Sequence, residues 1–135
     1  GPISALMTRD CLLPILAPLA AAQQQGGGLA ALSASLPSRF TAADRIKDVP
    51  IDRSKAFIAT LTHDWVARQS FFKNMGPEAE LDLTDGLRVH FDSGDVIHLR
   101  PSGNAPEFRI YAEASDERRA GYLVRVYSDF VSRMM

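Results

Sequence analysis

The most constraining feature of this sequence is a repeated alternation of apolar and polar residues between positions 81 and 112. Its apolar members fall into four short runs: Leu81 and Leu83; Leu87, Val89 and Phe91; Ile97 and Leu99; and Phe108, Ile110 and Ala112. A period of two places such residues on one face of an extended strand, so each run predicts a strand with one buried face. Because short turn segments separate the runs, the region predicts four antiparallel strands.

The turns between these strands determine which residues face each other. Three-residue loops at residues 84–86 and 93–95 keep the apolar runs on one common face, whereas two-residue loops would send one apolar row outward. The predicted cross-strand pairs are Asp82 with Arg88 and Glu80 with His90 in the first hairpin, and His90 with His98 and Arg88 with Arg100 in the second.

Helical patterns flank the strand region on both sides. Between about residues 53 and 73, apolar side chains recur every four residues and predict a buried stripe that includes Leu61 and Trp65. A break near Thr62 would make that residue the N-cap of a second helix. A last, amphipathic helix follows Asp116. We therefore predict an α+β fold, a four-stranded antiparallel sheet with helices packed on one face.

The first 37 residues have a different character, because they are rich in alanine and leucine and almost free of charge after Asp10. Thr8 is suited to cap a helix that contains Pro14 and Pro18 and ends at the Gln/Gly run of residues 23–28. A short helix at residues 29–36 completes a hairpin. This hairpin is apolar nearly all round, unlike a free-standing surface helix. We expect it to pack against another domain or against a second copy of the chain.

These patterns divide the chain into a helical hairpin at residues 1–37, a polar, proline-closed linker at residues 38–50, and a domain at residues 51–135. Cys11 is the sole cysteine. No intramolecular disulfide is therefore possible, which favours a reducing compartment and a cytoplasmic location. The apolar neighbours of Cys11 predict a buried, unreactive thiol.

The charge balance restricts the partners of the chain. The formal net charge is −1, so no global basic field exists to attract nucleic acid or an anionic membrane surface. The apolar run at residues 11–22 is shorter than the roughly 20 residues that a membrane-spanning helix needs. We expect no nucleic acid and no membrane as a partner, and any anion binding must be local.

The segment at residues 100–106, between the third and fourth predicted strands, is suited to such local binding. Arg100 offers a planar fork of donors, Ser102 and Asn104 add short polar side chains, and Gly103 allows close backbone approach. Consecutive amides in a turn can form an anion-binding concavity. The alternative is a plain loop whose Ser and Asn side chains bond their own backbone.

Two further groups of polar residues lie in the predicted strands. His90 and His98 face each other in the predicted register, but no carboxylate or thiol joins them, so we expect no metal site. Arg88 has two interpretations: it adds positive potential to a polar sheet face shared with Arg100 and Arg109, or it bonds Asp82 across the first hairpin.

Three spaced motifs resemble the C-terminal domain of the α-D-phosphohexomutases, the phosphomannomutase/phosphoglucomutase superfamily. They are Asp85-Gly86 at a strand start, the segment Arg100-Pro101-Ser102-Gly103-Asn104-Ala105-Pro106, and Arg109-Ile110-Tyr111-Ala112-Glu113. The chain departs from the family pattern at Asn104 and Ala105, where Thr and Glu are commoner. The resemblance implies that Arg100, Ser102, Gly103, Asn104 and Arg109 bind a substrate phosphate.

The resemblance also implies the chemistry of the whole enzyme. Such enzymes transfer a phosphoryl group between a phosphoserine and a hexose phosphate, with Mg²⁺ held on another domain. This chain contains neither that phosphoserine motif nor the metal loop, so no catalytic residue and no metal ligand carries over. We expect it to bind mannose or glucose 1- or 6-phosphate without turnover. Residues 1–37 then resemble the tail of the preceding sugar-binding domain, with the other domains of the enzyme as partners. The opposing hypothesis is a non-enzymatic module that binds a protein through its apolar hairpin.

Overall fold

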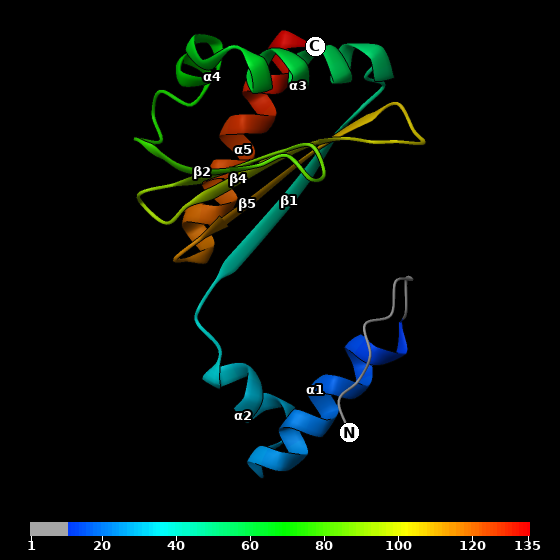
Figure 1. The fold of residues 1–135 in the computed structure, drawn as a ribbon, viewed down its shortest axis with the longest axis vertical. Coiled ribbons are helices and arrows are strands. Elements are labelled where there is room, and N and C mark those ends of the chain that lie inside the picture. The colour runs from blue at the N-terminus through cyan, green and yellow to red at the C-terminus, as the bar shows by residue number, and fades with distance from the viewer. Residues whose placement is uncertain (1–10) are drawn as a thin grey trace. The chain divides into compact units, whose positions relative to one another are not determined.

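The computed structural model describes residues 11–135. The chain divides into two compact units, Gly1–Pro37 and Ser38–Met135 (Figure 1). The predicted N-cap Thr8 lies outside the described residues. Among the residues that the structure describes, no helix is both long enough and apolar enough to cross a membrane.

The first unit is the expected helical hairpin, made of α1 (Leu12–Gln25) and α2 (Gly28–Ser35). Gly26 ends α1 in a left-handed conformation with φ of 76°, which glycine adopts without steric cost. Of the described residues in this unit, Ala22 alone is buried. Cys11 is exposed, so the prediction of a buried thiol is wrong. Two short helices without a third layer cannot enclose the side chains on their outer faces.

The second unit is built on a five-stranded antiparallel sheet in the order β1-β5-β4-β3-β2. Its strands are β1 (Phe40–Lys47), β2 (Glu78–Asp82), β3 (Leu87–Phe91), β4 (Val96–Pro101) and β5 (Glu107–Ala114). The predicted α+β class is confirmed, but the sheet has five strands where four were expected. The difference is β1, which occupies the predicted linker at residues 38–50 and pairs with β5. β1 lies at the sheet edge, and its apolar residues Ala42 and Ile46 are only partly buried against the core. An edge strand of this kind needs few apolar residues, so the apolar–polar alternation of β1 is weak in the sequence.

The two central hairpins differ in how well their register was predicted. In the first, the pairs Asp82–Arg88 and Glu80–His90 form as expected. In the second, Arg88 lies opposite His98 and His90 lies opposite Val96, a shift of two positions along β4. The loop is residues 92–94, with the Phe91 amide donating to Asp95 O over 3.0 Å.

Turn chemistry explains this shift. A three-residue hairpin loop favours glycine in its last position, where the backbone is left-handed. Gly94 fills that position with φ of 83°, as Gly86 does in the first hairpin with φ of 91°. Because the shift is an even number of residues, every side chain stays on its predicted face of the sheet.

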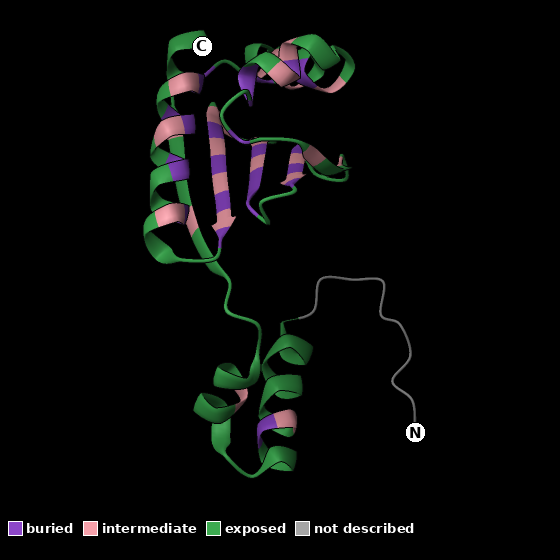
Figure 2. Cartoon of the chain, turned by 90° about the vertical axis from the view of Figure 1, so that its left-hand side faces the viewer, coloured by how far each residue is buried: buried purple, intermediate pink, exposed green. Residues whose placement is uncertain are grey.

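Three helices cover one face of this sheet: α3 (Ile51–His63), α4 (Trp65–Phe71) and α5 (Glu117–Met134). Apolar side chains from the strands and helices form one core (Figure 2). The predicted break after α3 occurs, but Asp64 caps α4 by accepting from the Ala67 amide over 2.9 Å, in place of Thr62. Trp65 is 61% exposed, so its assignment to the core is wrong. The stripe of α3 does not continue onto α4, because the chain is extended at Asp64.

The other face of the sheet carries no helix of the second unit. Along β3 and β5 its side chains are mostly polar or charged and half-buried, and they alternate with the buried core residues (Figure 2). We call this surface the open face.

Candidate functional site: an anion-binding loop and the open sheet face

The loop between β4 and β5 keeps some of its amides available for a ligand. The Ser102 amide donates to Glu107 O over 2.9 Å, and the Glu107 amide donates to Ala105 O over 2.7 Å. Gly103 and Asn104 are exposed, and their amides have no acceptor within the described residues. The Ser102 amide therefore continues the ladder between β4 and β5, while the loop keeps the Gly103 and Asn104 amides available for a ligand.

The side chains of the loop are partly organised before any ligand arrives. Ser102 is buried, and its Oγ donates to Asn104 Oδ1 over 3.2 Å. This internal bond joins the two side chains across the turn, whereas the plain-loop alternative had each of them bond its own backbone. The hydroxyl can still exchange that partner for a phosphate oxygen, since a hydroxyl rotates and both donates and accepts.

Arg100 stands at the end of β4, directly before this loop. Its Nε lies 2.9 Å from the Asp85 carboxylate, and its side chain is 37% exposed. The two terminal nitrogens have no acceptor in the part of the chain that the structure describes. Arg100 is thus oriented by one carboxylate through Nε and keeps its outer donors for an anion.

The turn that carries Asp85 fits closely against β4. Gly86 lies over the backbone of that strand, and a Cβ there would come within 2.4 Å of Leu99 O. His98 Nε2 donates to Asp85 O over 2.6 Å. The Asp85-Gly86 pair therefore has a physical role: glycine permits the contact, and the aspartate beside it orients Arg100.

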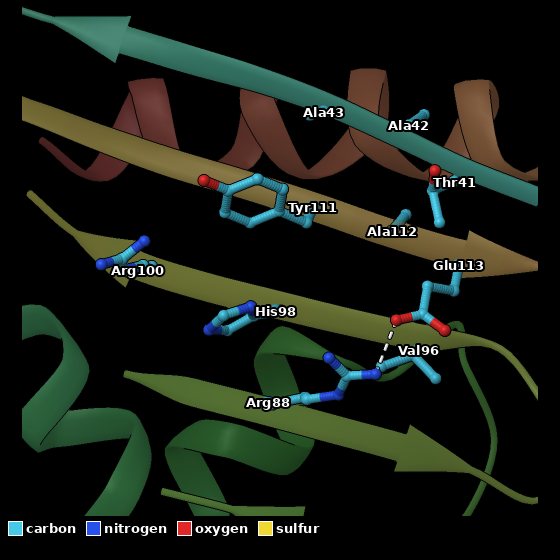
Figure 3. A pocket seen from close by; sticks show the side chains of 10 residues that line it. All are labelled: Thr41, Ala42, Ala43, Arg88, Val96, His98, Arg100, Tyr111, Ala112 and Glu113. Atoms are coloured by element: carbon cyan, nitrogen blue, oxygen red, sulfur yellow. Dashed lines mark hydrogen bonds and ion pairs between the residues drawn. The ribbon is translucent and has the colours of Figure 1, made fainter. Parts of the chain in front are cut away.

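The open face contains a hollow of about 430 Å³ beside Arg100 (Figure 3). Within it, Arg88 Nη2 bonds Glu113 over 2.6 Å, and the His98 and Tyr111 rings stack with centroids 5.4 Å apart. Arg88 does not bond Asp82, as one interpretation had it. Asp82 instead accepts from the Thr84 amide, and its hydrogen bonds to Thr84 lower its pKa below the usual 3.8.

Another hollow, of about 410 Å³, lies between the loop and α3. Gly103 lines it together with Lys55 and His63 of that helix. The loop therefore lines a hollow that contains a cationic and a titratable side chain from α3. Sequence reasoning did not connect α3 with this loop, because the contact depends on how α3 packs on the sheet.

The residues described here do not form a metal site. His90 and His98 are not cross-strand partners, since the register of the second hairpin is shifted. Within residues 11–135, no group of three His, Cys, Asp or Glu side chains is placed to hold a cation. Mg²⁺ therefore has no set of three such ligands in this part of the chain.

Fold and site together define a class: an α+β domain with a candidate anion-binding loop, built on a sheet that has one open face. Residues 39–127 match the family described as phosphoglucomutase/phosphomannomutase, C-terminal domain. The match covers more than half of the chain, and the chain belongs to this family.

Curated relatives agree with this assignment. The chain is 40% identical over 122 residues to a phosphomannomutase of Sinorhizobium fredii, covering 90% of this chain and 26% of that protein. It is 36% identical over 136 residues to a phosphomannomutase of Salmonella muenchen, covering 98% of this chain and 28% of that protein. A shorter match, 44% over 54 residues, is to a probable phosphoglucosamine mutase of Methanopyrus kandleri and covers 40% of this chain and 12% of that protein. The chain thus spans about a quarter of the length of the two phosphomannomutases.

Proposed function

We propose that this chain is the domain that holds the substrate phosphate in a phosphohexomutase. The whole enzyme would interconvert a hexose 1-phosphate and a hexose 6-phosphate by intramolecular phosphoryl transfer, with mannose or glucose phosphates as substrates. The observation that carries the proposal is the loop after β4, where the amides of Gly103 and Asn104 lack a protein acceptor beside the partly exposed guanidinium of Arg100.

Each of the proposed residues has a distinct task. Arg100 donates charge-assisted hydrogen bonds from its outer nitrogens, which suit the oxygens of a phosphate. Gly103 and Asn104 donate through their amides, and Ser102 donates through its hydroxyl. Arg109 lies opposite Arg100 on β5 and adds positive potential on the open face.

The proposed contribution to catalysis is positioning. Holding the non-reacting phosphate orients the sugar and lowers the entropy cost of the reaction at its other end. The nucleophile and the metal would belong to other domains of the enzyme, where Mg²⁺ neutralises charge on the transferred phosphoryl group. This chain alone should bind a hexose phosphate without converting it.

The helical hairpin fits the same proposal as the tail of the preceding, sugar-binding domain. Several of its large apolar side chains are exposed within the unit: Leu12, Leu13, Ile15, Leu16, Leu19, Leu29 and Leu36. Burial of such side chains is strongly favourable, so a neighbouring domain of the same enzyme would stabilise them. A second copy of the chain is the other occupant that would suit them. The single cysteine agrees with a reducing compartment such as the cytoplasm.

The test is an NMR titration of the chain with mannose 1-phosphate and glucose 6-phosphate, with unphosphorylated mannose as the matched ligand control. We expect the amide signals of Gly103 and Asn104 to shift with either phosphate and to stay unchanged with mannose. Arg100→Gln should weaken binding about tenfold, because it removes charge-assisted hydrogen bonds.

Two results would contradict the proposal. One is the absence of shifts in the loop at millimolar phosphosugar. The other is shifts confined to the helical hairpin, which would favour the protein-interaction module. Measurable isomerisation of a hexose phosphate by the chain alone would overturn the positioning role.

A further inference from the structure

Three arginines lie side by side across neighbouring strands of the open face. Arg45 of β1 is the direct partner of Arg109 of β5, and Arg109 is the direct partner of Arg100 of β4. We call these residues the arginine row. Like charges placed directly opposite each other destabilise a sheet. Repulsion within the arginine row therefore lowers the stability of the sheet, so stability does not explain why the three arginines are there.

The row is only partly compensated by carboxylates. Glu107 Oε1 lies 3.3 Å from Arg45 Nη1, and its Oε2 lies 3.9 Å from Arg109 Nη2. One carboxylate thus serves two arginines, while Asp85 pairs with Arg100. Glu107 also joins the row to the loop, because its backbone carbonyl accepts from the Ser102 amide.

The surroundings of the row provide space and further donors. A hollow of about 400 Å³ is lined by Arg45 and Arg109 together with Ala43, Asp44 and Tyr111. The Asp44 carboxylate accepts from the Arg45 amide over 2.8 Å. The Tyr111 hydroxyl has no hydrogen-bond partner within residues 11–135. Figure 3 shows Tyr111 on β5, between Ala43 of β1 and the side chains of β4.

The distances between strands allow the row to act on one ligand. Neighbouring strands lie about 4.8 Å apart, so the backbones at Arg45 and Arg100 are about 10 Å apart. Two long arginine side chains can converge across that span on one group above Arg109. The segment that follows β1 is also bonded to the loop, since the Val49 amide donates to Pro106 O over 3.0 Å.

We propose that the arginine row is part of the phosphate site and that Arg45 of β1 is a further phosphate-binding residue. The ligand is a dianionic phosphate ester seated between the loop and the row. Glu107 is the resident counter-ion, which gives up Arg45 and Arg109 when the phosphate arrives. The inference rests on the proposed function and extends its site by a strand that the sequence did not reveal.

The experiment measures the affinity of the full chain for inorganic phosphate and for glucose 6-phosphate in five forms: wild type, Arg45→Gln, Arg100→Gln, Glu107→Gln and Arg125→Gln. Arg125 is the matched control, because it is an exposed arginine of α5, which packs on the other face of the sheet. Circular dichroism and urea unfolding check that each variant is folded.

We expect Arg45→Gln to weaken both ligands about fivefold, in the upper range for exposed ion pairs. Glu107→Gln should strengthen both about threefold, because it releases two arginines from their counter-ion. Arg125→Gln should leave both affinities unchanged. The opposite signs for Arg45 and Glu107 are the decisive feature, since general damage to the fold weakens binding in both variants.

The outcomes separate the two proposals. If wild type binds and Arg100→Gln weakens binding, but Arg45→Gln binds as wild type does, the arginine row is excluded and the loop site stands. If Glu107→Gln weakens binding, its role as a counter-ion is wrong. If wild type binds neither ligand, both proposals fail together.

Discussion

The two faces of the sheet follow opposite physical rules, and adjacent residues of β5 show the contrast. Phe108 is fully buried and packs edge-on against Phe57, with ring centroids 5.9 Å apart. Arg109, the next residue, points to the open face, and its side chain is 38% exposed. One face is stabilised by removing apolar surface from water. The other face places arginines directly opposite each other on neighbouring strands.

This difference assigns different roles to the faces. Close packing on the core face makes each side chain costly to change. On the open face, exposed ion pairs contribute little to stability, so charge can be arranged for a ligand. The comparison shows that the sheet tolerates the arginine row on its open face because core packing does not depend on these side chains. Three predictions test this division.

The largest expected effect is on the core face. Phe108→Ala should lower the free energy of unfolding by about 3–5 kcal/mol, because it removes buried surface and leaves a cavity. Urea denaturation followed by circular dichroism measures this loss. A change below about 1 kcal/mol would mean that the core cluster around Phe108 relaxes freely, contrary to the packing described.

The neighbouring open-face residue should behave in the opposite way. Arg109→Gln should change the free energy of unfolding by less than about 0.5 kcal/mol, or raise it slightly, because it relieves repulsion from Arg45 and Arg100. Any gain should shrink as salt is added. The same urea titrations at low and high salt measure both quantities. A loss as large as that of Phe108→Ala would show that the open face is structural.

The smallest expected effect concerns acid. The hydrogen bonds from Thr84 lower the pKa of Asp82 in the folded chain. A carboxyl whose pKa is lowered by folding stabilises the folded chain at pH values above its unfolded pKa. This contribution is lost as the pH falls through the pKa of the folded state. Wild type should therefore lose stability below about pH 4, and Asp82→Asn should show a flatter profile there. Identical pH profiles of stability for wild type and Asp82→Asn from pH 5 to pH 2 would show that Asp82 does not cause this loss.

Much of the central sheet could be predicted because its signals are local. The alternation of apolar residues determined which face each strand buries, and Gly86 determined the first hairpin. The second hairpin was predicted at the correct loop length but the wrong position, because the role of Gly94 as the left-handed residue was overlooked. The loop that begins after Arg100 was recognisable from its own residues.

The sequence was less informative about which side chains contact each other in the folded chain. The four-residue spacing predicts Trp65 in the buried stripe of α3, but that helix ends at His63, two residues before it. One of the two interpretations of Arg88 bonded its side chain to Asp82 on β2, while the structure bonds it to Glu113, two strands away. Such choices depend on side chains from segments that are distant in the sequence.

The sequence alone therefore determined the period of the strands, the class of fold and the location of the loop for which we propose phosphate binding. Only the tertiary structure placed β1 beside β5 and brought Arg45 into line with Arg109 and Arg100. The physical reason is the range of the signal. Periodicity and turn chemistry act over a few residues, whereas Arg45 and Glu107 are 62 residues apart along the chain and become neighbours only when the edge strand joins the sheet.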